Sequence, residues 1–300
     1  MIVPFSHVLV LAVVLFSSAR AQLRNSVLVH RNFYGVLTLR ELDASEPDKR
    51  AYQLIHGRVS HGLQYQAGEK RGFPTSYYSE SSGVGLVWQA LRHAHGAGNP
   101  HLRVGIVGLG VGTLAAYGRR GDALRFYEIN PEVVRIAQDA RYFTYLGNCP
   151  ATVEVVLGDA RLSMEHELRQ NQAQRFDLLV VDAFAGDAVP VHLLTQQAFQ
   201  IYLDDLGPDG VLAIHISNTY LDLSPVLRRI ANYYRLDYRL VHTPGVPHIG
   251  SESIWALLSA DRALLDSVWK QKEGWANEPP TANLALWTDE YSNLLQVLRR

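Results

Sequence analysis

The sequence predicts an α/β fold, in which a doubly wound, Rossmann-like parallel sheet follows a small β-rich lobe at the N-terminus. Two patterns in the 300 residues support this prediction. From residue 103 to residue 217, short and nearly continuous apolar runs alternate with amphipathic segments, as in a parallel sheet that helices cover on both faces. From residue 33 to residue 66, apolar and polar residues alternate around a turn-rich stretch, which is typical of an antiparallel sheet.

The elements of the large domain follow in a regular order. A helix at "SSGVGLVWQALRHA" comes first, and the breaker "HGAGNPH" separates it from the sheet. The expected strands are "RVGIVG", "ALRFYEI", "TVEVVLG", "FDLLVVD" and "GVLAIHIS". The expected helices between them are "TLAAYGRR", "PEVVRIAQDA", a segment near residues 161–170, and "TQQAFQIYLDDL". The helix "LSPVLRRIANYY" and the runs "YRLVHTP" and "SIWALLSA" complete the sheet. We therefore expect an N-terminal segment (1–21), a β-rich lobe (30–70) and a Rossmann-like domain (80–300).

Composition and charge narrow the range of partners. The formal net charge is -1 at pH 7 and no long basic run occurs, so we expect no nucleic-acid partner and favour small molecules. The lone Cys149 excludes a multi-cysteine metal site. His56 and His61 flank "HGRVSHG", but no acid cluster follows them. We therefore expect structural or pocket-lining roles for both histidines and no metal.

The N-terminal segment is an apolar run from Ile2 to Phe16. Arg20, Arg24 and Arg31 all follow this run, and positive charges favour the cytoplasmic side of a membrane. The pattern predicts an anchor over residues 2–18 that holds the main domain at the cytoplasmic face of the membrane. The alternative is a signal peptide that is cleaved near residue 21, after which the protein would be exported.

A glycine-rich turn and two acids predict the main binding site. Gly108, Gly110 and Gly112 lie where the first strand of the large sheet turns, and glycine permits a tight turn and close approach of a ligand. Glu128 ends the second strand, where a carboxylate can bind both hydroxyls of a ribose. Asp159 ends the third strand and suits either the adenine amine or the N-cap of the next helix. The spacing lacks the third glycine of a dinucleotide fingerprint, which favours an adenosyl-sulfonium ligand over NAD.

The chain resembles the spermidine synthase family of aminopropyltransferases over most of residues 50–217. The matching segments are "GLGVGTL", "FYEINPEVVRIAQDARYF", "VVLGDAR", "FDLLVVDAF" and "LTQQAFQIYLDDLGPDGVLAIH". Other segments look like the synthase-like domain that bacteria carry fused behind a transporter-like membrane region: "RNFYGVLTLREL", "HGRVSHGLQY", "PTSYYSESSGVG" and "WTDEYSNLLQVLR". The resemblance implies a sheet like that of S-adenosylmethionine-dependent methyltransferases, and it implies a homodimer.

The resemblance also implies a transferase of polyamine biosynthesis. Such an enzyme passes an aminopropyl group from decarboxylated S-adenosylmethionine to an amine such as putrescine and releases methylthioadenosine. An amine is protonated at neutral pH, so a carboxylate must help to take its proton. By resemblance, Asp182 is this proton acceptor, Glu128 binds the ribose and Asp159 binds on the adenine side. No metal is implied.

The residues on the acceptor side match the family less closely. Tyr78 and Glu80 lie where the family has its Tyr-His-Glu element, and both are implied to contact substrate. The family has an acid where this chain has Val111, and a second acid where it has Ala185. Asp187 lies two residues further along and is the expected substitute. An acid at position 111 would repel the carboxylate of ordinary S-adenosylmethionine, whereas Val111 does not. Binding of S-adenosylmethionine and methyl transfer from it are therefore one alternative. A non-catalytic domain that binds a nucleoside or polyamine and regulates a membrane partner is another.

Overall fold

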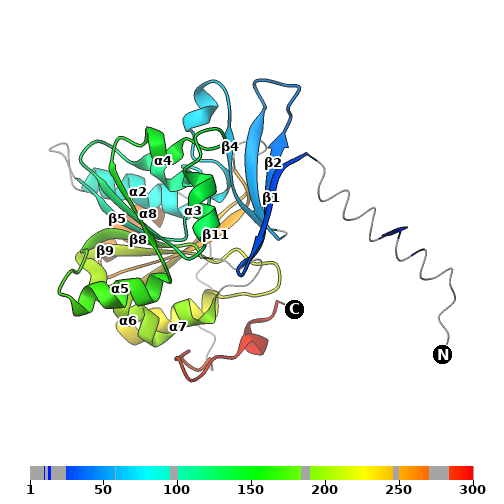
Figure 1. Cartoon of the computed structure of the whole chain (residues 1–300). Helices are drawn as coiled ribbons and strands as arrows, with labels where there is room; N and C mark the ends of the chain where they lie inside the picture. The colour runs from blue at the N-terminus through cyan, green and yellow to red at the C-terminus, as the bar shows by residue number, and fades with distance from the viewer. Residues whose placement is uncertain are drawn as a thin grey trace, which may run out of the picture.

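The computed structural model contains two sheets, and the N-terminal one lies beside the large domain (Figure 1). The structure describes residues 10, 13, 14, 25–57, 59–94, 101–183, 190–245, 250–269 and 284–299. The N-terminal sheet is antiparallel, in the order β1 (Ser26–Asn32), β2 (Gly35–Leu42), β3 (Ala51–His56) and β4 (Val59–Tyr65). In β2 the side chains of Leu37 and Leu39 are fully buried while their neighbours are half-buried, as the alternating sequence predicts. The predicted β-rich lobe is confirmed.

The large sheet has seven strands in the order β10-β11-β9-β8-β5-β6-β7. Their bounds are β5 (Arg103–Val107), β6 (Ala123–Glu128), β7 (Thr152–Leu157), β8 (Phe176–Val181), β9 (Leu206–His215), β10 (Asp237–Thr243) and β11 (Ser253–Ser259). Strands β5 to β9 run parallel, and β11 is antiparallel to both of its neighbours. Because β6 and β8 lie on opposite sides of β5, the chain reverses direction across the sheet there. A crevice is expected outside the carboxyl end of β5.

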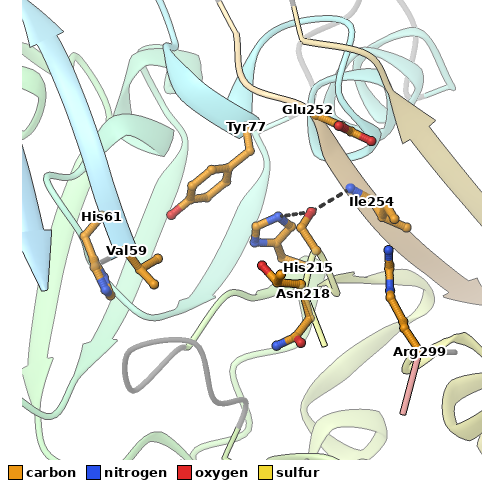
Figure 2. A pocket seen from close by; sticks show the side chains of 10 residues that line it. Val59, His61, Tyr77, His215, Asn218, Glu252, Ile254 and Arg299 are labelled. Carbon is orange, nitrogen blue, oxygen red and sulfur yellow. Dashed lines mark hydrogen bonds between the residues drawn. The ribbon is translucent and has the colours of Figure 1, made fainter. Parts of the chain in front are cut away.

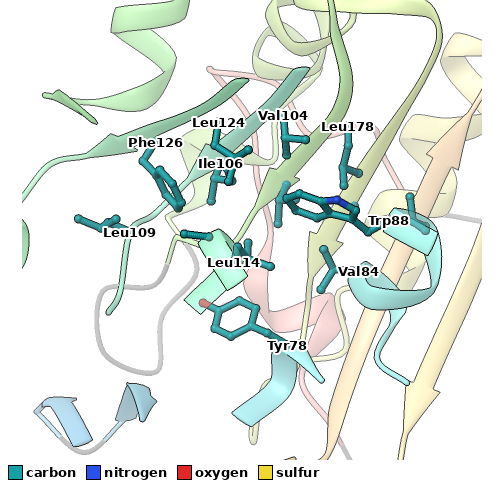
Figure 3. Close-up of a cluster of buried hydrophobic side chains, with 14 of the residues drawn as sticks. Tyr78, Val84, Trp88, Val104, Ile106, Leu109, Leu114, Leu124, Phe126 and Leu178 are labelled. Atoms are coloured by element: carbon teal, nitrogen blue, oxygen red, sulfur yellow. The ribbon is translucent and has the colours of Figure 1, made fainter. Parts of the chain in front are cut away.

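Helices cover both faces of this sheet, as the doubly wound prediction requires (Figure 1). One face packs against α2 (Gly83–Ala94), α3 (Pro131–Ala137), α4 (Tyr145–Asn148) and α8 (Arg262–Trp269). The other face packs against α5 (Ala160–Arg169), α6 (Gln196–Asp205) and α7 (Ser224–Tyr234). Figure 3 shows how α2 contributes to the first face: Trp88 and Val84 lie over Val104 of β5 and Leu178 of β8.

One predicted helix is wrong. The segment after the glycine turn forms only a short 3-10 helix, Thr113–Tyr117, in place of the α-helix expected at "TLAAYGRR". Gly112 has a left-handed backbone before this segment, and Gly118 is extended after it. These two residues leave space for only one tight turn between them.

The predicted location at the cytoplasmic membrane is also wrong. Within the part of the chain that the structure describes, no helix has the length and apolar character needed to cross a bilayer. The predicted anchor over residues 2–18 lies mostly outside the described residues.

Candidate active site

A cavity of about 440 Å³ opens at the carboxyl ends of β5, β6 and β8, where the topology predicts a crevice. We call it the first cavity. The predicted site residues that line it are Tyr78, Gly108, Gly110, Glu128, Asp159 and Asp182. Gly112 does not line it, and neither does Glu80, whose side chain is exposed. Asp187 lies outside the described residues.

The glycine turn brings the backbone against both the end of the neighbouring strand β8 and the lobe. Gly108 and Gly110 have φ of 98° and 54°, in the left-handed region that favours glycine. A Cβ on Gly108 would collide with the carbonyl oxygen of Asp182. A Cβ on Gly110 would lie 2.5 Å from the carbonyl oxygen of His61 in β4. Gly112 also has a left-handed backbone, but it faces Leu146 and so packs outside the cavity.

Glu128 is fixed by the loops on either side of it. Its Oε2 accepts the backbone N–H of Leu109 at 3.0 Å, and its Oε1 accepts that of Asn130 at 2.8 Å. Burial raises the pKa of this carboxyl above its usual value, while these N–H groups act in the opposite direction. Each oxygen keeps lone-pair capacity for a further donor. The geometry suits a ligand that presents two adjacent hydroxyls.

Asp159 caps α5. Its Oδ1 accepts the backbone N–H of Leu162 at 3.0 Å, which is the N-cap role weighed from the sequence. Its Oδ2 lies 3.2 Å from Nε2 of His192, which also lines the cavity. The cap orients the carboxylate at the cavity wall, so the cap role and a ligand role are compatible.

Asp182 follows β8 and is paired with Tyr78. The Tyr78 hydroxyl donates a very short hydrogen bond to Oδ2 of Asp182, and both residues are buried. Tyr78 comes from the 3-10 helix Ser76–Tyr78, which connects the lobe to α2. Burial, followed by the charge of Asp182, raises the pKa of Tyr78 well above its usual value. Tyr78 therefore stays protonated and acts as a hydrogen-bond donor to the carboxylate.

Sequence reasoning missed two residues that complete this network. Nδ1 of His215 lies 2.7 Å from Oδ1 of Asp182, and Nε2 of His215 lies 2.7 Å from Oγ of Ser217. The backbone N–H of Ile254 donates to the same Ser217 oxygen at 2.8 Å. His215 ends β9, the neighbour of β8, so the strand-end rule that found Asp182 could also have found it.

A second cavity, of about 320 Å³, lies on the other side of this network (Figure 2). His61 and Tyr77 line both cavities and so form the wall between them. In Figure 2 the Tyr77 ring lies between His61 and His215. The other lining residues are Val59, His215, Ser217, Asn218, Thr219, Glu252, Ile254 and Arg299.

Val111 does not lie at either cavity. Its side chain is buried in the apolar cluster on one face of the large sheet, where it packs against Gly62 of β4. A Cβ on Gly62 would lie 2.5 Å from Cγ2 of Val111. The position that carries an acid in the spermidine synthase family is here part of the contact between the lobe and the large sheet.

The strand order, with one antiparallel strand near an edge, and the cavity beyond β5 define the fold class of the chain. It is an α/β, methyltransferase-like Rossmann fold with an additional N-terminal sheet. Solved spermidine synthases share this fold, so the predicted resemblance is confirmed for the fold.

Three solved structures illustrate the likeness. The spermidine synthase from Thermotoga maritima aligns with a TM-score of 0.54 at 14% identity, covering 89% of this chain and 82% of that one. A probable spermidine synthase from Corynebacterium glutamicum aligns with a TM-score of 0.59 at 16% identity, covering 81% and 86%. A spermidine synthase in complex with the transition-state analogue AdoDATO aligns with a TM-score of 0.51 at 14% identity, covering 89% and 82%.

Sequence comparison finds two shorter matches, and no family model matches the chain. The N-terminal histidine N-methyltransferase of Emericella nidulans is 29% identical over 150 residues, 49% of this chain and 26% of that protein. The polyamine aminopropyltransferase of Vibrio vulnificus is 30% identical over 121 residues, 39% of this chain and 38% of that protein. The chain therefore matches well under two thirds of the length of either curated relative.

Proposed function

We propose that this protein transfers an aminopropyl group from decarboxylated S-adenosylmethionine to an amine such as putrescine. The observation that carries the proposal is the buried Tyr78–Asp182 pair, which lines the first cavity together with the shared wall residues His61 and Tyr77. The names of the Vibrio vulnificus relative and of the structural neighbours support it. Dimer formation stays a prediction from the resemblance.

In this proposal the first cavity holds the nucleoside. Glu128 binds the ribose hydroxyls, Asp159 binds on the adenine side, and Gly108 and Gly110 let the backbone approach the ligand. Asp182 lines the same cavity, and in this proposal its carboxylate stabilises the positive charge that the donor carries beside the reacting carbon. The reaction needs the amine in line with the carbon–sulfur bond, and positioning by the two cavities supplies this.

The test is a calorimetric titration of the full chain with decarboxylated S-adenosylmethionine, S-adenosylmethionine and methylthioadenosine, followed by product analysis with putrescine. We expect preference for the decarboxylated form and an aminopropylated product. We also expect Asp182→Asn to lower kcat by roughly 100-fold or more and to leave methylthioadenosine affinity unchanged. Asp204→Asn, at an exposed position on α6, is the matched control.

Methyl transfer from S-adenosylmethionine is the second candidate, and Val111 is the observation that favours it. With an apolar side chain buried at this position, no acid there repels the carboxylate of the ordinary cofactor. The match to a histidine N-methyltransferase points the same way. Preference for S-adenosylmethionine in the titration, with a methylated product, would replace the first proposal. Binding without any product would leave a ligand-binding domain.

A further inference from the structure

Asp182 is poorly placed to take a proton from an acceptor directly. Both of its oxygens are already bonded, Oδ2 to the Tyr78 hydroxyl and Oδ1 to the His215 ring. Its side chain is 2% exposed, and that of His215 is 5% exposed. A proton that reaches Asp182 from the second cavity must therefore pass through a group that lines that cavity.

Ser217 is such a group. It lines the second cavity, and its hydroxyl is 2.7 Å from Nε2 of His215, whose other nitrogen faces Asp182. Since Nδ1 donates to the carboxylate, the neutral ring offers its Nε2 lone pair to the Ser217 hydroxyl. The Ser217 oxygen also accepts the N–H of Ile254, which fixes its position and leaves one lone pair for a donor in the cavity.

Aromatic rings hold the His215 side chain from both faces. The ring is stacked between Tyr77, with centroids 4.4 Å apart, and Trp255, with centroids 4.8 Å apart. The stacking and the bond to Asp182 fix the ring with its Nε2 atom towards Ser217.

His61, in the wall between the cavities, is uncharged at neutral pH. Burial, together with the nearby His56, lowers the pKa of His61 to about 4, so its ring is neutral and does not repel a cationic reactant. Its Nε2 atom is buried without a hydrogen-bond partner among the described residues. It is available to a ligand at the boundary of the two cavities.

We propose that the second cavity binds the acceptor amine and that Ser217, backed by His215 and Asp182, takes the proton that the acceptor ammonium must lose before it attacks. This inference rests on the proposed function and adds the acceptor's location and the path of its proton. It makes Ser217 a catalytic residue and His215 a positioning residue that acts through it.

The step balances in atoms and charge. The acceptor ammonium gives a proton to Ser217 Oγ while the Ser217 hydroxyl proton passes to Nε2 of His215. The lone pair that is freed forms the nitrogen–carbon bond, the carbon–sulfur bond breaks, and its electron pair goes to sulfur. The product leaves as a secondary ammonium with methylthioadenosine, and the His215 imidazolium then gives its proton to water.

The first experiment compares Ser217→Ala and Ser217→Thr with the wild type, using putrescine and decarboxylated S-adenosylmethionine. We expect Ser217→Ala to lower kcat at least tenfold, Ser217→Thr to retain most of it, and methylthioadenosine affinity to stay within twofold in both. Ser267→Ala, at an exposed serine on α8, is the control. Full kcat in Ser217→Ala would overturn the inference.

The second experiment separates proton transfer from packing. His215→Ala leaves a gap between two aromatic rings, which added imidazole or the equally flat but weakly basic pyrazole can fill. We expect imidazole to restore turnover and pyrazole not to. Equal rescue by both would show a packing role and overturn the inference. If the wild type binds methylthioadenosine but transfers nothing to putrescine, the proposed function itself fails. If the wild type is active and the Ser217 and His215 variants are equally active, only the present inference fails.

Discussion

Burial and local hydrogen bonds shift the pKa of Glu128 in opposite directions. Burial disfavours the charged carboxylate, and the N–H groups of Leu109 and Asn130 partly offset this cost. A group whose pKa is raised on folding weakens the folded state at pH values where it is ionised. Such an arrangement is typical of a site residue, because a residue selected for stability alone would not carry this cost.

Replacing this carboxylate should weaken nucleoside binding. We expect Glu128→Gln to raise the Kd for methylthioadenosine by roughly 10- to 150-fold, since charge-assisted hydrogen bonds contribute about 1.5–3 kcal/mol. Titration calorimetry measures this change directly. Glu132→Gln is the matched control, because Glu132 is a buried acid that pairs with Arg135 and does not line either cavity. Equal losses in both variants would argue for a general effect on the fold.

His61 predicts a dependence of stability on pH. Its pKa is about 4 in the folded protein against 6.5 ordinarily, so the unfolded chain binds more protons between these values. The stability that neutral His61 contributes is complete above pH 6.5 and is lost as the pH falls towards 4. On acidification from pH 7 to pH 5, we expect the wild type to lose about 2 kcal/mol more than His61→Gln. Urea unfolding of both proteins at the two pH values measures the difference, and parallel losses would contradict it.

At the scale of elements, the glycine turn is the most constrained segment. Gly110 combines a left-handed backbone with contact against β4, whereas Gly68 has φ of 66° and open space around it. Substituting alanine at Gly68 therefore tests backbone strain alone, whereas the same substitution at Gly110 tests strain combined with a steric collision.

We expect Gly68→Ala to cost about 1 kcal/mol of unfolding free energy from backbone strain. Gly110→Ala should cost at least twice as much, because the lobe must move away from the loop, and it should also weaken methylthioadenosine binding. Chemical unfolding and calorimetry of the two variants test this. A similar cost for both would mean that the contact between the loop and β4 is unimportant.

Whether the sequence predicts an element or a site residue depends on whether local interactions or long-range packing determine its position. The sequence places Glu128, Asp159 and Asp182 at one edge because the carboxyl ends of parallel strands meet there, and this placement depends only on local pattern and a general rule of topology. The same rule applied to β9 would have found His215. The sequence pattern predicts a helix after Gly112, but the extended Gly118 ends the segment after a short 3-10 turn.

The sequence allows a pocket-lining role for His61, but it cannot place this residue in a wall between two cavities. His61 and Tyr77 reach the site only because the lobe docks against the glycine turn, and docking depends on the fit of two surfaces. For the same reason, the burial of Val111 against Gly62 could not be read from the glycine motif.

At the scale of the whole molecule, polar side chains join the lobe to the large domain. Gln64 in β4 is 1% exposed, and its amide donates to Oγ1 of Thr144 at 3.1 Å and accepts the Thr144 N–H at 2.7 Å. The amide of Asn32 in β1 donates to Oδ1 of Asn130 at 2.7 Å. Because these contacts are buried or half-buried, the lobe and the large domain should unfold together.

Gln64→Ala tests this coupling. It leaves the Thr144 N–H without its acceptor, so we expect a loss of about 2 kcal/mol in the free energy of unfolding. Gln53→Ala removes a hydrogen bond to Ser60 inside the lobe and should cost less. Far-ultraviolet and near-ultraviolet circular dichroism should report one common transition in the wild type. Two separate wild-type transitions would show that the lobe folds independently.

The wall formed by His61 and Tyr77 has a consequence for how the protein can diversify. The floor of the first cavity is encoded after residue 100, whereas the wall and Val59 of the second cavity are encoded before residue 80. Each cavity is thus encoded partly before residue 80 and partly after residue 100. Recombination between related genes near residue 80 would replace the shared wall and so alter both cavities at once.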